Sequence, residues 1–241
     1  MRKRYFAIII VIYLIAGGFT TSHDKTDIIT RIHFKHWVGN KELVLFDETY
    51  TNNFDEPFVV SKFRYYISAI SFTDINNRET ILPAAYYLVN EADSLSKIIQ
   101  LQLAAPIKSI SFIVGVDSIR NISGVQTGSL DPANGMFWTW NSGYVFAKLE
   151  GQSDSSHAPA HSFTWDAGGF RQHENALRKI TLMTGQTAST GEHTIVVNAN
   201  ILKWFDGVHP LRISQSPVCH QPGKLAMQIA DNYSTMFSVA P

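Results

Sequence analysis

The sequence is poor in cysteine, in net charge and in long apolar runs. Its single cysteine, Cys219, excludes an intramolecular disulfide in a chain of 241 residues. Twenty basic and twenty acidic residues leave no formal net charge, which argues against a surface built to bind nucleic acid. Beyond the N-terminal segment, no apolar run reaches the roughly 20 residues of a transmembrane helix. We therefore expect no nucleic-acid partner, and no membrane insertion beyond that segment.

The N-terminal segment has the layout of a secretory signal. Three basic residues at positions 2–4 precede an apolar run over 5–15 and small residues at 16–18. We assign residues 1–22 to a signal peptide and residues 23–241 to one mature domain in the periplasm, or otherwise exported. Its cleavage site is mediocre, so an uncleaved N-terminal anchor is the alternative.

The pattern of the mature part is that of strands. Apolar and polar residues alternate along most of it, as they do where side chains point to opposite faces of a strand. The content of hydrophobic residues, 45%, is enough for a substantial core. The expected strands span 32–38, 43–46, 58–72, 81–89, 107–116, 136–149 (bent at Gly143), 178–183 and 193–200.

Helical signals are few. A short turn is expected over 95–100, and a helix after Pro222-Gly223, where Leu225, Ile229 and Tyr233 are spaced four apart. The long stretch 117–135 is rich in turn residues, as functional loops and Ω-loops are. The predicted fold class is all-β: a single β-sandwich or jelly-roll-like domain with one short C-terminal helix.

Common enzyme signatures are missing. The sequence contains no Gly-rich phosphate loop, no nucleophile elbow and no HExxH motif. No nucleophile and base are evident near the 117–135 stretch. We therefore predict that the protein is not an enzyme, and that Cys219 is a half-buried small hydrophobe rather than a metal ligand or reactive thiol.

Nine histidines raise the question of a metal. Imidazole suits copper, zinc and nickel, and copper is a plausible metal for an exported protein. His36 stands out because the alternation places it on the apolar face of its strand with Phe34. On this pattern alone it is either a hydrogen-bonded core histidine or a ligand with a supporting partner.

Two tryptophans and a set of oxygen donors leave further alternatives. Trp138 and Trp140, two apart, are expected on one face of their strand, where they pack in the core or line a metal or redox site. Calcium could use oxygen ligands around the long loop, but these lack EF-hand spacing, so turn formation is the expected role. The residues concerned are Asp117, Asn121, Asp131 and Asn134.

A long motif occupies the central part of the chain. It comprises Phe112-Ile113-Val114-Gly115-Val116-Asp117-Ser118, Arg120-Asn121-Ile122-Ser123-Gly124 and Leu130-Asp131-Pro132-Ala133-Asn134-Gly135-Met136-Phe137-Trp138-Thr139-Trp140. This motif resembles the MbnP-like family of exported copper-binding proteins, which are related to the methanobactin-associated periplasmic protein. Shorter pieces fit the same family in order along nearly all of the mature chain.

The resemblance implies a β-sandwich that binds copper through histidine and, in some members, through a tryptophan oxidised to kynurenine. It implies a dihaem peroxidase-like partner for that oxidation. Carried over by position, His36 is a candidate ligand, and Trp138 or Trp140 is the candidate for oxidation. Kynurenine has a carbonyl and an aniline nitrogen, so an apolar ring would become a polar group able to bind metal.

One departure from the family pattern concerns the metal site. Where the family has an aromatic-His-Ile-Gly-Gly-Phe motif, this chain has Trp165-Asp166-Ala167-Gly168-Gly169-Phe170. Asp166 therefore replaces a histidine; a carboxylate can bind Cu(II) or zinc but suits Cu(I) poorly. His161 or His173 could compensate. The leading hypothesis is a copper carrier or buffer, and the alternative is a β-sandwich interaction module that has lost its metal.

Overall fold

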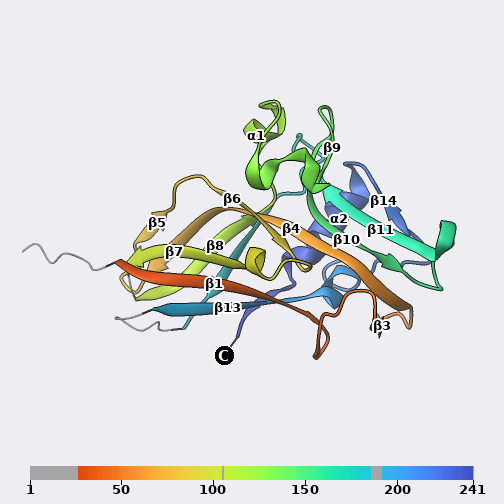
Figure 1. The fold of residues 1–241 in the computed structure, drawn as a ribbon, viewed down its shortest axis with the longest axis horizontal. Coiled ribbons are helices and arrows are strands. Elements are labelled where there is room, and N and C mark those ends of the chain that lie inside the picture. The colour runs from red at the N-terminus through yellow and green to blue at the C-terminus, as the bar shows by residue number, and fades with distance from the viewer. Residues whose placement is uncertain (1–26, 105, 186–191, 241) are drawn as a thin grey trace, which may run out of the picture.

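Two β-sheets pack face to face in the computed structural model, which describes residues 27–104, 106–185 and 192–240 (Figure 1). The assigned signal peptide lies outside these residues. The smaller sheet has the order β15 (Phe237–Val239), β13 (His193–Asn200), β1 (Asp27–Val38), β2 (Lys41–Glu42), with β7 (Ile98–Ala104) also paired to β1. β1 and β13 run parallel, and β1 and β7 antiparallel.

The larger sheet is built around the long strand β4 (Pro57–Asp74). Its order is β12 (Arg178–Met183), β8 (Ile107–Val114), β4, β10 (Gly143–Gln152), β11 (Ser162–Gly168), β14 (Val218–Cys219). Four short strands complete it: β3 (Thr49–Thr51), β5 (Glu79–Ile81) and β6 (Tyr86–Asn90) pair with β4, and β9 (Phe137–Thr139) pairs with β10.

Helices are short and peripheral. α2 (Lys224–Ser234) packs against β11 and β12, and α1 (Ser118–Ile122) follows β8. The 3₁₀ turns are η1 (Leu95–Lys97), η2 (Gly128–Leu130), η3 (Pro132–Asn134), η4 (Pro159–His161) and η5 (Ile201–Trp204). The sheet-rich sandwich with one short helix near the C-terminus confirms the predicted fold class.

Several predicted boundaries were wrong. Residues 43–46 are a loop, and the predicted strand 81–89 is two separate strands, β5 and β6. The aromatic strand 136–149 is a hairpin: β9 ends at Thr139, a turn follows, and β10 begins at Gly143, the predicted bend, with a φ of +78°. Residues 98–104 and 162–168, which had no predicted strand, form β7 and β11. Both depend on a neighbouring strand for their hydrogen bonds, which local sequence does not reveal.

Aromatic side chains fill the space between the two sheets. Phe34 of β1 lies 5.9 Å, centroid to centroid, from both Tyr65 of β4 and Phe112 of β8, in edge-to-face geometry. Phe237 of β15 packs against the same three rings. Such pairs contribute about 0.5–1.5 kcal/mol each beyond the area they bury. This aromatic contact defines the inner face of the larger sheet.

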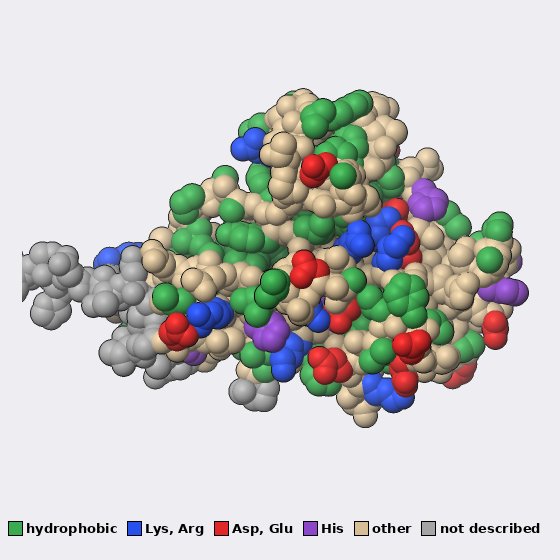
Figure 2. All heavy atoms as spheres, in the orientation of Figure 1, with side chains coloured by type: hydrophobic (Ala, Val, Ile, Leu, Met, Phe, Trp, Pro, Cys, Tyr) green, Lys and Arg blue, Asp and Glu red, His purple; other side chains and the backbone are tan. Residues whose placement is uncertain are grey.

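The segment between β8 and β10 projects from the outer face of the larger sheet, as α1 and β9 show in Figure 1. Asn121 anchors it: its side-chain amide donates to the Val116 carbonyl, and its oxygen accepts from the Tyr144 amide, both at 2.8 Å. The projection exposes Ile119, Ile122 and Val125, and Figure 2 shows hydrophobic side chains there. The predicted long loop is thus an ordered cover for the sheet.

A buried carboxylate ties together two segments at one end of the molecule. Glu56, only 4% exposed, accepts hydrogen bonds from the backbone amides of Ile213 (2.8 Å) and Ser214 (3.0 Å). The side chains of Ser214 (2.6 Å) and Asn52 (2.8 Å) also donate to it. Burial acts to raise the pKa of Glu56, but these donors outweigh burial and lower it. Glu56 therefore fixes the start of β4 against the segment that precedes β14.

Replacing Glu56 is expected to destabilise the protein. Glu56→Ala leaves four donors without their acceptor, so we expect the free energy of unfolding to fall by about 3 kcal/mol in urea denaturation. Glu48→Ala is the control, because Glu48 makes only a surface ion pair with Lys41 and such pairs contribute less than about 1 kcal/mol. Equal losses in the two variants would contradict this assignment.

Candidate metal site

His36 lies in the interior between the sheets. Its side chain is fully buried and packs edge-to-face on Phe63, 4.8 Å away. Nδ1 forms a hydrogen bond with the Glu91 carboxylate, and Nε2 lies 2.9 Å from the Tyr65 hydroxyl. Because an ionised carboxylate can only accept, Nδ1 carries the proton, and the Nε2 lone pair accepts from Tyr65. A metal would have to bind the Nε2 lone pair, and that lone pair already accepts the hydrogen bond from Tyr65.

Charge around His36 is balanced without a metal. Lys97 places its ammonium 3.1 Å from both carboxylate oxygens of Glu91. Burial lowers the pKa of His36, although the bond to Glu91 opposes this. Burial acts to raise the pKa of Glu91, but His36 and Lys97 outweigh it and the pKa is lowered. The geometry is that of a hydrogen-bonded core histidine, the first of the two alternatives.

Asp166 lies on the opposite, outer face of the larger sheet. β10 pairs with β4 on one side and β11 on the other, with Lys148 opposite both Arg64 and Asp166. Their neighbours Ala147 and Leu149 are fully buried toward the core. Since successive side chains of a strand point to opposite faces, His36 and Asp166 are separated by the sheet. They cannot bind the same ion.

An ion-pair chain runs across this outer face. The Lys148 ammonium lies 2.9 Å from Oδ2 of Asp166 and 2.7 Å from Glu150, which in turn lies 2.8 Å from Lys62. His220 places Nδ1 3.5 Å from the same Oδ2 of Asp166. Lys148 of β10 and His220, the residue after β14, therefore both lie next to the Asp166 carboxylate of β11.

The second oxygen of Asp166 has no partner in the described part of the chain. Asp166 is 4% exposed, and its Oδ1 is buried without a hydrogen bond. Burial raises the pKa of Asp166, and the nearby Lys148 opposes that rise. A buried polar atom left unpaired costs about 1–3 kcal/mol, and more where it is charged. Oδ1 is thus an oxygen that could bind a metal and that forms no hydrogen bond within the described residues.

Trp138 lies beside Asp166. Asp166 and Gly168 are two apart on β11 and so share its outer face, and the Trp138 ring packs on Gly168. A Cβ built on Gly168 would lie 2.9 Å from Cζ3 of that ring and 2.4 Å from the Tyr144 carbonyl oxygen. The indole Nε1 is buried and, within the described residues, also has no hydrogen-bond partner. Glycine is required here because the Tyr144 carbonyl oxygen, and beyond it the Trp138 ring, occupy the place of a side chain.

Trp140 is not on the same face as Trp138, contrary to the prediction. It lies in the turn after β9, is 54% exposed, and packs on Phe137 at 4.8 Å. The turn at 140–142 breaks the alternation on which the prediction rested. Trp138, by contrast, packs on Gly168 of the strand that carries Asp166.

His220 was missed by the sequence reasoning. It follows β14, a two-residue strand that runs parallel to β11 with Cys219 opposite Trp165. This pairing, which no local pattern indicates, brings His220 to Asp166. Cys219 itself is buried, and burial raises the pKa of its thiol to about 12, so it stays protonated at neutral pH.

The other predicted donors lie elsewhere. His161 precedes β11, five residues from Asp166 along an extended strand, a separation of about 16 Å at 3.3 Å per residue. His173 is exposed in the loop after β11. Among residues 27–104, 106–185 and 192–240, no group of three or more His, Cys, Asp and Glu side chains could hold a metal ion.

The oxygen donors proposed for calcium serve the backbone. Oδ1 of Asp117 accepts from the Arg120 amide at the start of α1, and Oδ1 of Asp131 accepts from the Ala133 amide at η3. Asn134 donates to the Gly128 carbonyl. These are turn and capping interactions, as the alternative to calcium predicted.

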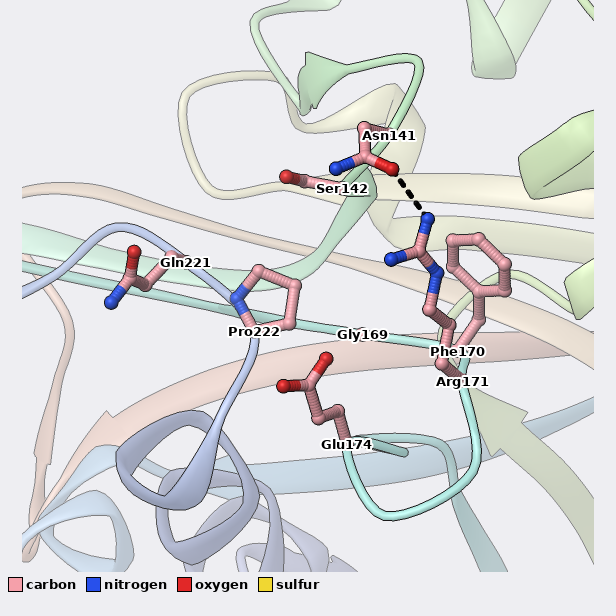
Figure 3. Close-up of a pocket in the computed structure, with 8 residues that line it drawn as sticks. All are labelled: Asn141, Ser142, Gly169, Phe170, Arg171, Glu174, Gln221 and Pro222. Atoms are coloured by element: carbon pink, nitrogen blue, oxygen red, sulfur yellow. Dashed lines mark hydrogen bonds between the residues drawn. The ribbon is translucent and has the colours of Figure 1, made fainter.

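A cavity of about 150 Å³ adjoins the outer-face residues (Figure 3). Its walls come from the segments that follow β9, β11 and β14, so it lies next to His220 and at the ends of the strands that carry Trp138 and Asp166. Arg171 closes one side by donating to Asn141 at 2.5 Å. The lining residues are Asn141, Ser142, Gly169, Phe170, Arg171, Glu174, Gln221 and Pro222.

Comparison with known proteins agrees with this architecture. The family model described as MbnP matches residues 28–221. The solved structure of MbnP from Methylosinus trichosporium superposes with a TM-score of 0.62 at 11% identity, covering 88% of this chain and 98% of that one. At this identity the likeness shows the fold alone. No curated protein matches the chain.

The buried imidazole makes stability depend on pH. Unfolding returns His36 to its ordinary pKa of 6.5, so below that pH the unfolded chain takes up a proton that the folded chain does not. The lowered pKa of Glu91 acts in the same direction at lower pH. We expect the free energy of unfolding to fall as the pH drops from 6.5 to 5.5, by at most about 1 kcal/mol through His36, measured by urea denaturation.

His36→Gln, which keeps polar atoms but does not titrate, should show a shallower fall. His157→Gln is the matched control because His157 is exposed. An unchanged pH dependence in His36→Gln would show that His36 is not responsible.

Proposed function

Because the chain belongs to the MbnP family, we propose that it is an exported copper-binding protein, a carrier or buffer rather than a catalyst. Copper is bound on the outer face of the larger sheet by Asp166 and His220, beside Trp138. Residues 1–22 direct export, and no helix within the described residues is long and apolar enough to cross a membrane.

The observation that carries the proposal is the unpartnered Oδ1 of Asp166. This carboxylate is buried, yet one oxygen has no donor in the described chain, and an imidazole lies near the other oxygen. Binding a cation removes the energetic penalty that burial imposes on such a carboxylate. A carboxylate and an imidazole suit Cu(II) better than Cu(I).

Trp138 is the tryptophan that we propose for oxidation. It packs on Gly168, next to Asp166 on β11, whereas Trp140 is turned to solvent. Conversion to kynurenine would place a carbonyl and an aniline nitrogen at the position of the indole, which could complete the donor set. We propose that a dihaem peroxidase-like partner catalyses the step with hydrogen peroxide as the oxidant: two equivalents cleave the indole C2–C3 bond, and hydrolysis releases C2 as formate.

A metal-free interaction module is the second candidate, and the Lys148–Asp166 ion pair favours it. The Lys148 ammonium, 2.9 Å from Oδ2, already supplies a positive charge to the carboxylate. A metal at Asp166 must compete with that charge. Copper binding therefore depends on how far Lys148 can be drawn toward Glu150, which lies 2.7 Å away.

Copper titration separates the two candidates. We expect about one equivalent of Cu(II) to bind the mature protein, with affinity reduced at least about tenfold in Asp166→Asn and in His220→Ala, a loss of about 1.4 kcal/mol. Lys148→Met should strengthen binding by removing the competing charge. His36→Gln and His157→Ala should bind as the wild type does. Binding no tighter than that of the urea-unfolded chain, or unaffected by Asp166→Asn and His220→Ala, would favour the metal-free module.

The modification is tested by intact mass in the native host. Protein purified there should carry a mass change that Trp138→Phe removes and Trp140→Phe retains, because only the first ring lies beside the metal donors. Loss of the change in Trp140→Phe alone would contradict the assignment. A heterologous host without the peroxidase serves as the unmodified reference.

A further inference from the structure

Two hollows lie at the end of the larger sheet where β4 begins, β10 ends and β11 begins. One, of about 330 Å³, lies over the outer face of these strands. The other, of about 420 Å³, is bounded by β3 and η4. They share Val59 and Gln152, so the two hollows adjoin, and together they are called the groove here. Its size is within the range of about 300–1,000 Å³ found for small-molecule sites, whereas the 150 Å³ cavity near Arg171 is below that range.

The groove combines an apolar floor with free hydroxyls. Val59 gives the smaller hollow an apolar side chain, and Ser61 and Thr164 border it as well; Phe163, which also borders it, is fully buried in the core. Neither hydroxyl has a hydrogen-bond partner within the described residues, although both side chains are half-buried. A hydroxyl both donates and accepts, so these side chains can bind a ligand that also does both. Gln152 adds an amide with the same property.

An exposed phenylalanine stands at the rim. Phe46 is 67% exposed and adopts a φ of +71°, a left-handed conformation that is rare for a bulky side chain. Its amide donates to the Val60 carbonyl at 2.9 Å, which fixes the loop to β4. The fold thus holds a flat apolar ring in solvent, next to the hydroxyls, at an energetic cost.

Backbone strain gathers around this groove. Seven non-glycine residues within the described ranges have positive φ, and three of them, Phe46, Ala160 and His161, line the two hollows. Residues held in such conformations cluster at ligand-binding sites because the surrounding structure must enforce them. This observation is independent of the shape and polarity of the groove.

We propose that this groove binds a neutral saccharide of one or two sugar rings. The C–H face of a pyranose packs on a flat aromatic ring, here Phe46, and its hydroxyls pair with Ser61, Thr164 and Gln152. The ligand beside Phe46 is neutral because the one carboxylate that lines the smaller hollow, Glu150, is already paired with Lys62 and Lys148; the exposed Asp154 lines the other hollow. The site does not use copper, so the proposal stands apart from the metal site.

The test is an NMR titration of the isotope-labelled mature protein with five sugars. D-glucose, D-galactose, N-acetylglucosamine, maltose and cellobiose are each added to about 10 mM, since weak small-molecule sites have Kd values on the order of 1 mM. At least one sugar should shift the backbone amides of Ser61, Gln152 and Thr164. Phe46→Ala should weaken its binding at least tenfold, and Phe46→Trp should retain or strengthen it.

The matched control is Val44→Ala. Val44 is exposed on the same loop but does not line either hollow, so its replacement should leave sugar binding unchanged. The proposal is overturned if no sugar shifts these amides, if the shifts map elsewhere, or if Phe46→Ala binds as well as the wild type. Copper titration of Phe46→Ala should match the wild type, so failure of one site is distinguishable from failure of the other.

Discussion

The pairing of β10 between β4 and β11 is the constraint on which the other features depend. Its register places Ala147 and Leu149 in the core and Lys148 between Arg64 and Asp166 on the outer face. A shift of β10 by one residue would exchange its two faces, burying the charged side chains of Lys148 and Glu150 among the aromatic rings of the sandwich. The hydrophobic core and the outer-face ion pairs are therefore specified by the same hydrogen bonds.

The two faces treat their ionisable groups differently. On the inner face, His36, Tyr65, Glu91 and Lys97 form a closed network, in which both ring nitrogens of His36 and both carboxylate oxygens of Glu91 have a partner. On the outer face, Asp166 keeps one oxygen unpaired although it is buried. A satisfied buried network mainly stabilises the fold, whereas an unsatisfied buried group calls for a functional explanation. The difference moves the candidate metal site from His36 to Asp166.

Lys148 decides how strong a metal site this face can be. A buried carboxylate beside an ammonium is already partly compensated, so a metal gains less from binding it. The histidine that the family pattern has in place of Asp166 would need no such counter-charge, because neutral imidazole is the ligand form. Asp166 and Lys148 are thus best understood together: one introduces a charge at the site and the other balances it.

The sequence alone determined the all-β class, the C-terminal helix and the strands 178–183 and 193–200. It could do so because alternation and turn residues are local properties. The resemblance to the family also came from contiguous motifs around Trp138. The pattern could not show that His36 is fully hydrogen-bonded, since its partner Glu91 lies 55 residues away. Nor could it show that Trp140 leaves the strand at a tight turn, or that a two-residue strand brings His220 to Asp166. Those outcomes were decided by the tertiary structure, because strand pairing and burial arise between segments that local sequence cannot relate to one another.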